Sequence, residues 1–274
     1  MRRNVLVALG VACGLMLAVN AMAGPAAGTG INQSAHDLVF NNYTADPPDT
    51  ALAGAGPRIC IYCHAPHNTY KLSPANLGPA FDSNLTAPDP FNYLPLWNHQ
   101  LTDNYGAYTM YFPGPGRPTT GPRALQAFNA MTPGSSSLLC LSCHDGSVAV
   151  NSYGNSSQKL SSVSVGSHFI QSAAYIIGQN NYLGNHHPIG FNYSAVSAVD
   201  LESVGGIRDA GIATLGGAGT VADHLYASKM ECGTCHSVHN TGNTGESLLW
   251  RSDASSRLCL TCHAKGDNPG QTVP

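Results

Sequence analysis

The chain has 274 residues, and only 10% of them are charged, with a formal net charge of −3 at pH 7. This slightly acidic balance argues against a nucleic-acid partner. The chain also contains 30 Gly and 18 Pro, and no hydrophobic period of 3.6 or 2 residues is sustained, which argues against an ordinary core of long helices or a large sheet.

Residues 1–23 have the pattern of a secretory signal peptide. Two arginines precede an uncharged apolar run at 5–19, and Ala21 and Ala23 form a small-x-small cleavage site before Gly24. A membrane anchor would need about 20 apolar residues, and no later segment supplies them. We therefore expect export through the periplasm to the cell surface or the medium, with no membrane span in the mature chain.

Eight of the nine cysteines form four C-x-x-C-H motifs, and the ninth, Cys13, lies in the expected signal peptide. Two cysteines three residues apart on one helical turn can form thioethers with the two vinyl groups of one haem, and the following histidine can bind its iron. The sequence therefore predicts four covalently bound haem c groups. The motifs are Cys60–Cys63–His64, Cys140–Cys143–His144, Cys232–Cys235–His236 and Cys259–Cys262–His263.

Two alternatives use the same cysteines. Paired C-x-x-C motifs also hold structural zinc, and an exported chain can pair its cysteines as disulfides. Neither explains why a histidine follows every one of the four pairs, so covalent haem is the better interpretation.

The second axial ligand of each iron must come from elsewhere in the chain. Methionine is a common choice, but the mature chain has only Met110, Met131 and Met230, in no persuasive context. Eight further histidines favour bis-histidine iron. The first two candidates, His67 and His239, each follow a proximal histidine by three residues. They share its side of the attachment helix, so each should serve a neighbouring iron.

Two more histidines complete the preferred set of distal ligands. His187 precedes Pro188, which restricts its backbone to extended conformations, and His36 lies in the Gly-rich N-terminal segment. His99, two residues after Trp97, is a fifth and weaker candidate for four positions. The contexts of the remaining three give no sharper reason for ligation: His168, His186 and His224.

These observations predict a multihaem cytochrome c fold, mostly coil with short helices wrapped around four covalently bound haems and little sheet. Short helices are expected near each motif, with one or two small hairpins. Residues 24–274 would form a single tetrahaem domain with an N-terminal arm at 24–58.

Several of these stretches together resemble a family: SAHDL, CIYCHAPHN, PLWNHQ, LCLSCHDGSVAV, HHPIGF, MECGTCHSVH and LCLTCH. The chain resembles secreted multihaem cytochromes with doubled C-x-x-C-H motifs, above all the tetrahaem extracellular cytochromes that polymerise into conductive filaments (OmcE-like nanowires). The resemblance implies subunits stacked head to tail and one axial histidine donated across the subunit boundary, for which His36 is the candidate. It also favours His67, His187 and His239 over His99.

The function expected is electron transfer rather than catalysis, because bis-histidine iron has no open position for a substrate. Expected partners are further copies of the chain, other redox cytochromes and extracellular electron acceptors. A monomeric periplasmic electron shuttle is the main alternative. A multihaem reductase is a weaker one, because it needs a five-coordinate haem with acid–base residues beside it.

Overall fold

The computed structural model describes residues 30–38, 59–65, 96–102, 104, 107–111, 131, 133–150, 152–153, 169–170, 172–199, 206–241, 246 and 248–264. The expected signal peptide, most of the expected arm, His67 and His168 lie outside these residues. Within them, no helix has the length and apolar character needed to cross a membrane.

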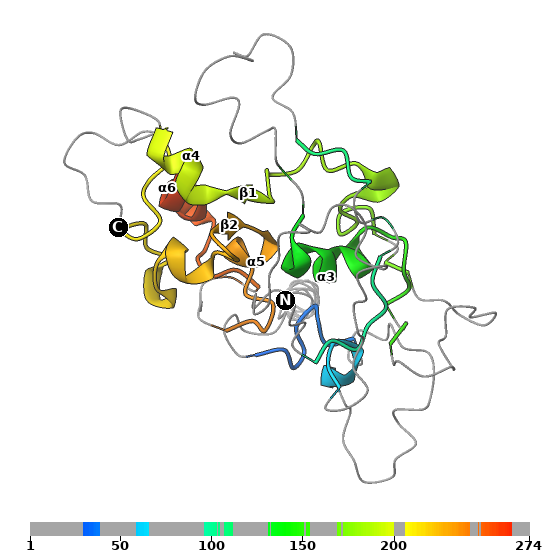
Figure 1. Cartoon of the computed structure of the whole chain (residues 1–274). Helices are drawn as coiled ribbons and strands as arrows, with labels where there is room; N and C mark the ends of the chain where they lie inside the picture. Colours follow the sequence, from blue (N-terminus) through cyan, green and yellow to red (C-terminus); the bar gives the residue numbers. More distant parts are fainter. Residues whose placement is uncertain are drawn as a thin grey trace, which may run out of the picture.

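Short helices are the main regular structure of the described residues (Figure 1). The α-helices are α3 (Ser135–His144), α4 (Tyr193–Val199), α5 (Cys232–Cys235) and α6 (Arg257–Cys262). Single 3-10 turns make up the rest: η2 (Ile59–Tyr62), η6 (Gln179–Asn181), η7 (Gly216–Ala218), η8 (Val221–His224) and η9 (Ala254–Ser256). The expectation of mostly coil with short helices is confirmed.

The described sheet consists of two strands of two residues each. β1 (Phe191–Asn192) pairs antiparallel with β2 (Lys229–Met230), with Phe191 opposite Met230. The pair joins segments far apart in the chain, whereas the sequence suggested local hairpins. A strand pair this short contributes little by itself, so side-chain packing must hold these segments together.

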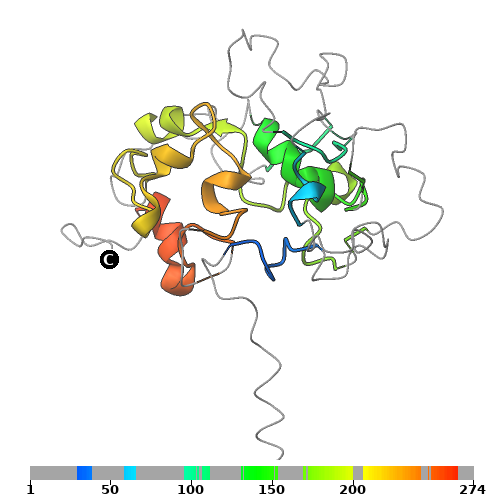
Figure 2. The same ribbon diagram turned by 90° about the horizontal axis from the view of Figure 1, so that it is seen from below.

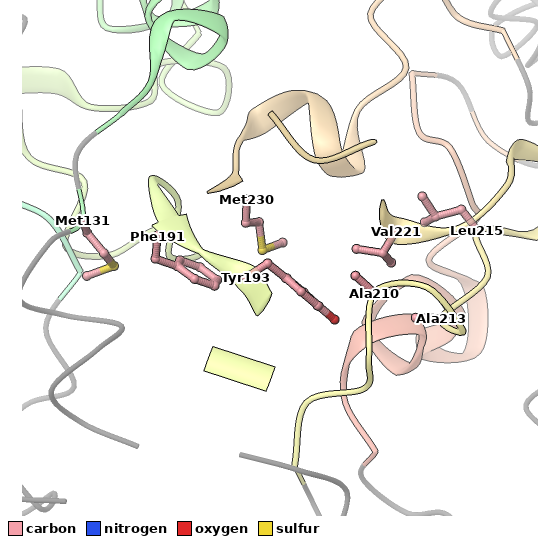
Figure 3. Packing of buried hydrophobic residues seen from close by; sticks show 8 residues of the cluster. All are labelled: Met131, Phe191, Tyr193, Ala210, Ala213, Leu215, Val221 and Met230. Atoms are coloured by element: carbon pink, nitrogen blue, oxygen red, sulfur yellow. The ribbon is translucent and has the colours of Figure 1, made fainter. Parts of the chain in front are cut away.

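The described residues contain two small apolar clusters. The larger one surrounds the β1–β2 pair, where Tyr193 lies between Met230 and Ala210 (Figure 3). Its buried members are Met131, Phe191, Tyr193, Ala210, Ala213, Leu215, Val221 and Met230. The smaller cluster joins Leu138 and Leu141 of α3 to Leu183. Cys235 and Cys262 pack against the larger cluster, so the aliphatic core and the cysteine motifs share their surfaces.

Residues 30–38 connect the two halves of the described structure. In Figure 2 this segment, in blue, runs from the C-terminal part of the chain toward α3 and η2. Its start is fixed by the Gly30 N–H, which donates to the Asn240 carbonyl at 3.1 Å, and by the Asn240 amide, which donates to the Gly30 carbonyl at 3.0 Å. The arm is thereby tied to the segment that follows the third C-x-x-C-H motif.

Candidate haem-binding sites

Each C-x-x-C-H motif forms one helical turn, as its chemistry requires. We number the sites I to IV in chain order; α3, α5 and α6 contain both cysteines of sites II, III and IV, whereas η2 contains Cys60 of site I and ends one residue before Cys63. At sites I, III and IV the N–H of the histidine donates to the carbonyl of the first cysteine, at 2.8, 3.1 and 3.0 Å. This turn places both cysteines and the histidine on one side of the backbone, where a single macrocycle can meet all three.

Three of the four motif histidines face a second histidine. The ring centroids are 6.1 Å apart for His64 and His239, 6.2 Å for His144 and His36, and 6.3 Å for His263 and His187. Two imidazoles that bind one ion from opposite sides, each with a ring nitrogen about 2.0–2.1 Å from it, have centroids roughly 6.3 Å apart. The residues therefore fit a bis-histidine iron at sites I, II and IV.

Backbone carbonyls orient the rings of several of these histidines. Nδ1 lies 2.7 Å from the Tyr175 carbonyl in His144, 3.1 Å from the Val238 carbonyl in His36 and 2.9 Å from the Pro188 carbonyl in His187. An Nδ1–H that donates to a carbonyl fixes the tautomer and leaves the Nε2 lone pair for a metal.

Site III differs from the other three. His236 Nδ1 lies 3.2 Å from the Leu248 carbonyl, so its Nε2 lone pair is left for a metal as in the other histidines. However, no described histidine forms a ring pair with His236. His67, the one remaining preferred candidate, lies outside the described residues.

The structure separates His99 from the axial candidates. Its side chain is 1% exposed, with Nδ1 2.7 Å from the Gln100 carbonyl and Nε2 3.0 Å from the Ala149 carbonyl. Both ring nitrogens face backbone oxygens, and Nε2 also lies 3.5 Å from the Cys143 sulfur. We therefore propose a structural role for His99, and likewise for His224, whose Nε2 contacts the Ala218 carbonyl at 2.7 Å.

Contacts between cysteines show which sites are neighbours. The Cys140 thiol donates a hydrogen bond to the Cys232 sulfur, which holds the pKa of Cys140 well above its ordinary value and joins sites II and III. Burial raises the pKa of Cys143, and so does the charge of Cys63 at site I. Burial likewise raises the pKa of Cys235 to about 12, with a further contribution from Cys262 at site IV.

Site III thus touches each of the other sites. It meets site II through Cys232, site IV through Cys235, and site I because His239, three residues after His236, faces His64. The packing of α3 beside α5 is visible in Figure 1. The described cysteines with exposed side chains are Cys60 and Cys259, the first cysteines of sites I and IV.

Two buried carboxylates stand at opposite ends of α3. At its start, Glu231 accepts hydrogen bonds from the Gly134 N–H at 3.0 and 3.1 Å and from the Ser137 hydroxyl. Burial raises the pKa of Glu231 to about 7, although the bonds from Ser137 and Gly134 lower it. The Ser137 hydroxyl also accepts the N–H of Cys232 at 3.0 Å, which ties the attachment helices of sites II and III together.

At the other end of α3, Asp145 directly follows His144 and is 4% exposed. Its carboxylate accepts bonds from the Thr102 hydroxyl at 2.5 Å, Tyr108 at 2.7 Å and the Ser147 N–H at 2.8 Å. Burial alone would raise the pKa of Asp145, but these donors outweigh it and the pKa is lowered. Sequence reasoning missed Asp145 and Glu231, although each is adjacent in sequence to a motif.

Residues 224–268 match the model of a family described by its doubled CXXCH motif. The match indicates a c-type cytochrome. It covers sites III and IV, and it supports covalently bound haem c and a role in electron transfer. No curated protein and no solved structure matches the chain.

The arrangement of the described residues also bears on the zinc alternative. In this part of the chain, no three His, Cys, Asp or Glu side chains converge as they would around a bare metal ion.

Proposed function

We propose that the chain is an exported tetrahaem cytochrome that carries electrons through bis-histidine haems. The observation that carries this proposal is the spacing of 6.1–6.3 Å between three motif histidines and a second histidine each. Haem bound there would supply a reversible one-electron couple. The chain's own residues hold the axial rings, and the larger aliphatic cluster packs against Cys235 and Cys262.

The fourth pair follows from a reciprocal relationship between sites I and III. His239 lies three residues after the proximal histidine of site III and faces the proximal histidine of site I. His67 lies three residues after His64 in the same way. We assign His67 to His236 by this exchange, which would complete four six-coordinate sites.

The ferric spectrum of the purified, haem-loaded protein tests this assignment. Four haems per chain, all low-spin, are expected, and His67→Ala should convert one haem in four to high spin. His168→Ala is the matched control and should leave all four low-spin. A high-spin band of one-haem intensity in the unsubstituted protein would overturn the assignment. It would point to an open position at His236, which a reductase would require.

We further propose that the protein is released from the cell and assembles into conductive filaments. The resemblance to polymerising cytochromes supports them, as does the exposure of Cys60 and Cys259, which brings an edge of site I and an edge of site IV to the surface. Within one chain His36 faces its own His144. Donation of His36 to a neighbouring subunit would therefore require the arms at 30–38 to exchange between chains.

Electron microscopy of the secreted, haem-loaded fraction decides between polymer and shuttle. Filaments of uniform width are expected, and discrete particles would favour a monomeric periplasmic shuttle. His36→Ala separates the two ways in which a filament could be built. Arm exchange predicts that this variant loses its filaments, whereas an internal His36 predicts filaments with one altered haem.

A further inference from the structure

Two buried side-chain polar atoms of the described residues have no hydrogen-bond partner: Trp97 Nε1 and Ser136 Oγ. A serine hydroxyl can donate or accept and can rotate, whereas an indole N–H can only donate in a fixed direction. Leaving such a donor buried and unpaired costs about 1–3 kcal/mol. In native proteins an orphaned donor of this kind calls for a specific explanation.

Trp97 is held directly beside site I. The Ala65 N–H donates to the Leu96 carbonyl at 2.9 Å, and the Asn98 N–H donates to the Cys63 carbonyl at 2.8 Å. These two bonds flank Trp97 and place it opposite His64 in an antiparallel bridge. The indole ring is only 8% exposed, and its centroid lies 6.3 Å from that of His64 at an interplanar angle of 87°.

The side chains next to Trp97 already have acceptors for their donors. The Asn98 amide donates to the Ile61 carbonyl at 2.6 Å, and both ring nitrogens of His99 face carbonyls. The missing acceptor is therefore specific to Trp97. A haem held by Cys60, Cys63 and His64 would lie next to the His64 ring, which Trp97 adjoins. The haem rim carries two propionate carboxylates, which are strong acceptors.

We propose that Trp97 binds the haem of site I by donating its indole N–H to a propionate. The inference rests on the proposed function, because it requires haem at Cys60 and Cys63. A hydrogen bond to a propionate withdraws negative charge from the haem and so stabilises the reduced form. Trp97 would raise the reduction potential of site I as well as fix the orientation of its haem.

The second tryptophan of the chain provides a matched control. Trp250 Nε1 already donates to the Gly233 carbonyl at 2.8 Å, so Trp250→Phe removes an indole N–H that has a protein acceptor. Trp97→Phe removes the orphaned one. Both variants keep an aromatic ring of similar shape, and both are studied as the full, haem-loaded chain.

The experiment begins with the number of haems per chain and the mass of the peptide that contains Cys60 and Cys63. An unmodified peptide would show that the proposed function fails at site I, independently of Trp97. With haem attached, we expect Trp97→Phe to lower one of the four reduction potentials and to shift a propionate bending mode in the resonance Raman spectrum. Trp250→Phe should do neither.

A second measurement does not depend on how the variants fold. In the unsubstituted haem-loaded protein, the Trp97 indole N–H should exchange slowly, and its NMR shift should follow the titration of a carboxylate. The Trp250 signal should be independent of pH. Unchanged potentials and Raman modes in Trp97→Phe, or a Trp97 signal that does not titrate, would overturn the proposal while leaving the haem assignments intact.

Discussion

The Val238 carbonyl holds the ring of His36, a residue 202 positions earlier in the chain, with Nδ1 3.1 Å from the oxygen. Val238 lies between His236, the proximal histidine of site III, and His239, which faces His64 of site I. Since His36 itself faces His144, one segment of four residues serves sites I, II and III. This segment, 236–239, thus links three of the four sites.

Asn240 anchors the N-terminal arm to this segment. It is 1% exposed, its amide donates to the Gly30 carbonyl at 3.0 Å, and its side-chain oxygen accepts the Leu248 N–H at 2.9 Å. We expect Asn240→Ala to lower the free energy of unfolding by about 1–3 kcal/mol and to make His36 ligation incomplete. Chemical unfolding and the high-spin fraction measure the two effects. Asn192→Ala removes an exposed cap of α4, which should cost about 0.5–2 kcal/mol in stability but leave every haem low-spin.

The neighbouring histidines His186 and His187 give a test of site IV with a built-in control. His187 faces His263, whereas no ring pair involves His186. We expect His187→Ala to convert one haem in four to high spin, and His186→Ala to leave the ferric spectrum unchanged. Equal spectra for the two variants would remove His187 from the axial set.

His99 should matter for stability but not for iron coordination. Burial lowers the pKa of His99 and keeps the ring neutral, so His99→Leu removes one ring N–H and leaves one of the Gln100 and Ala149 carbonyls without its buried donor, which should cost about 1–3 kcal/mol in the free energy of unfolding. All four haems should stay low-spin. A new high-spin signal in this variant would contradict the structural role assigned to His99.

Glu231 should make the protein less stable as the pH rises from mildly acidic to neutral. Its pKa is about 7 in the folded chain and 4.5 in the reference state, so the folded state binds more protons between these values and loses stability with increasing pH. The effect is on the order of 3 kcal/mol across this window. Glu231→Gln should flatten the profile of unfolding free energy against pH; parallel profiles would exclude the effect.

Asp145, at the other end of α3, should have the opposite effect on stability, which it should increase as the pH rises. Its pKa lies below the reference value of 3.8 in the folded chain, so it stabilises the protein above pH 3.8 and loses that contribution as the pH falls. Asp145→Asn should cost about 1–3 kcal/mol at neutral pH. The difference in the free energy of unfolding between this variant and the unsubstituted protein should become smaller as the pH falls. Unfolding at several pH values checks this, with the exposed Asp209→Asn as control.

The sequence by itself predicts the four attachment sites. C-x-x-C-H is a local pattern, because one helical turn brings two cysteines and the next histidine together whatever the rest of the chain does. The structure has such a turn at each motif, and the match at residues 224–268 agrees with two of them. The sparse sheet and short helices followed from the same composition and motifs.

Only the tertiary structure decided which distal histidine meets which site. His36 and His144 are separated by more than 100 residues, as are His64 and His239, and no local pattern encodes such a pairing. Sequence spacing predicted that His239 serves a neighbouring site, but only the structure places its ring opposite that of His64. His99 resembled a ligand in the sequence, whereas in the structure it lies buried between two carbonyls, which favours a structural role. Local covalent chemistry is encoded over five residues, whereas axial partners depend on how distant segments pack.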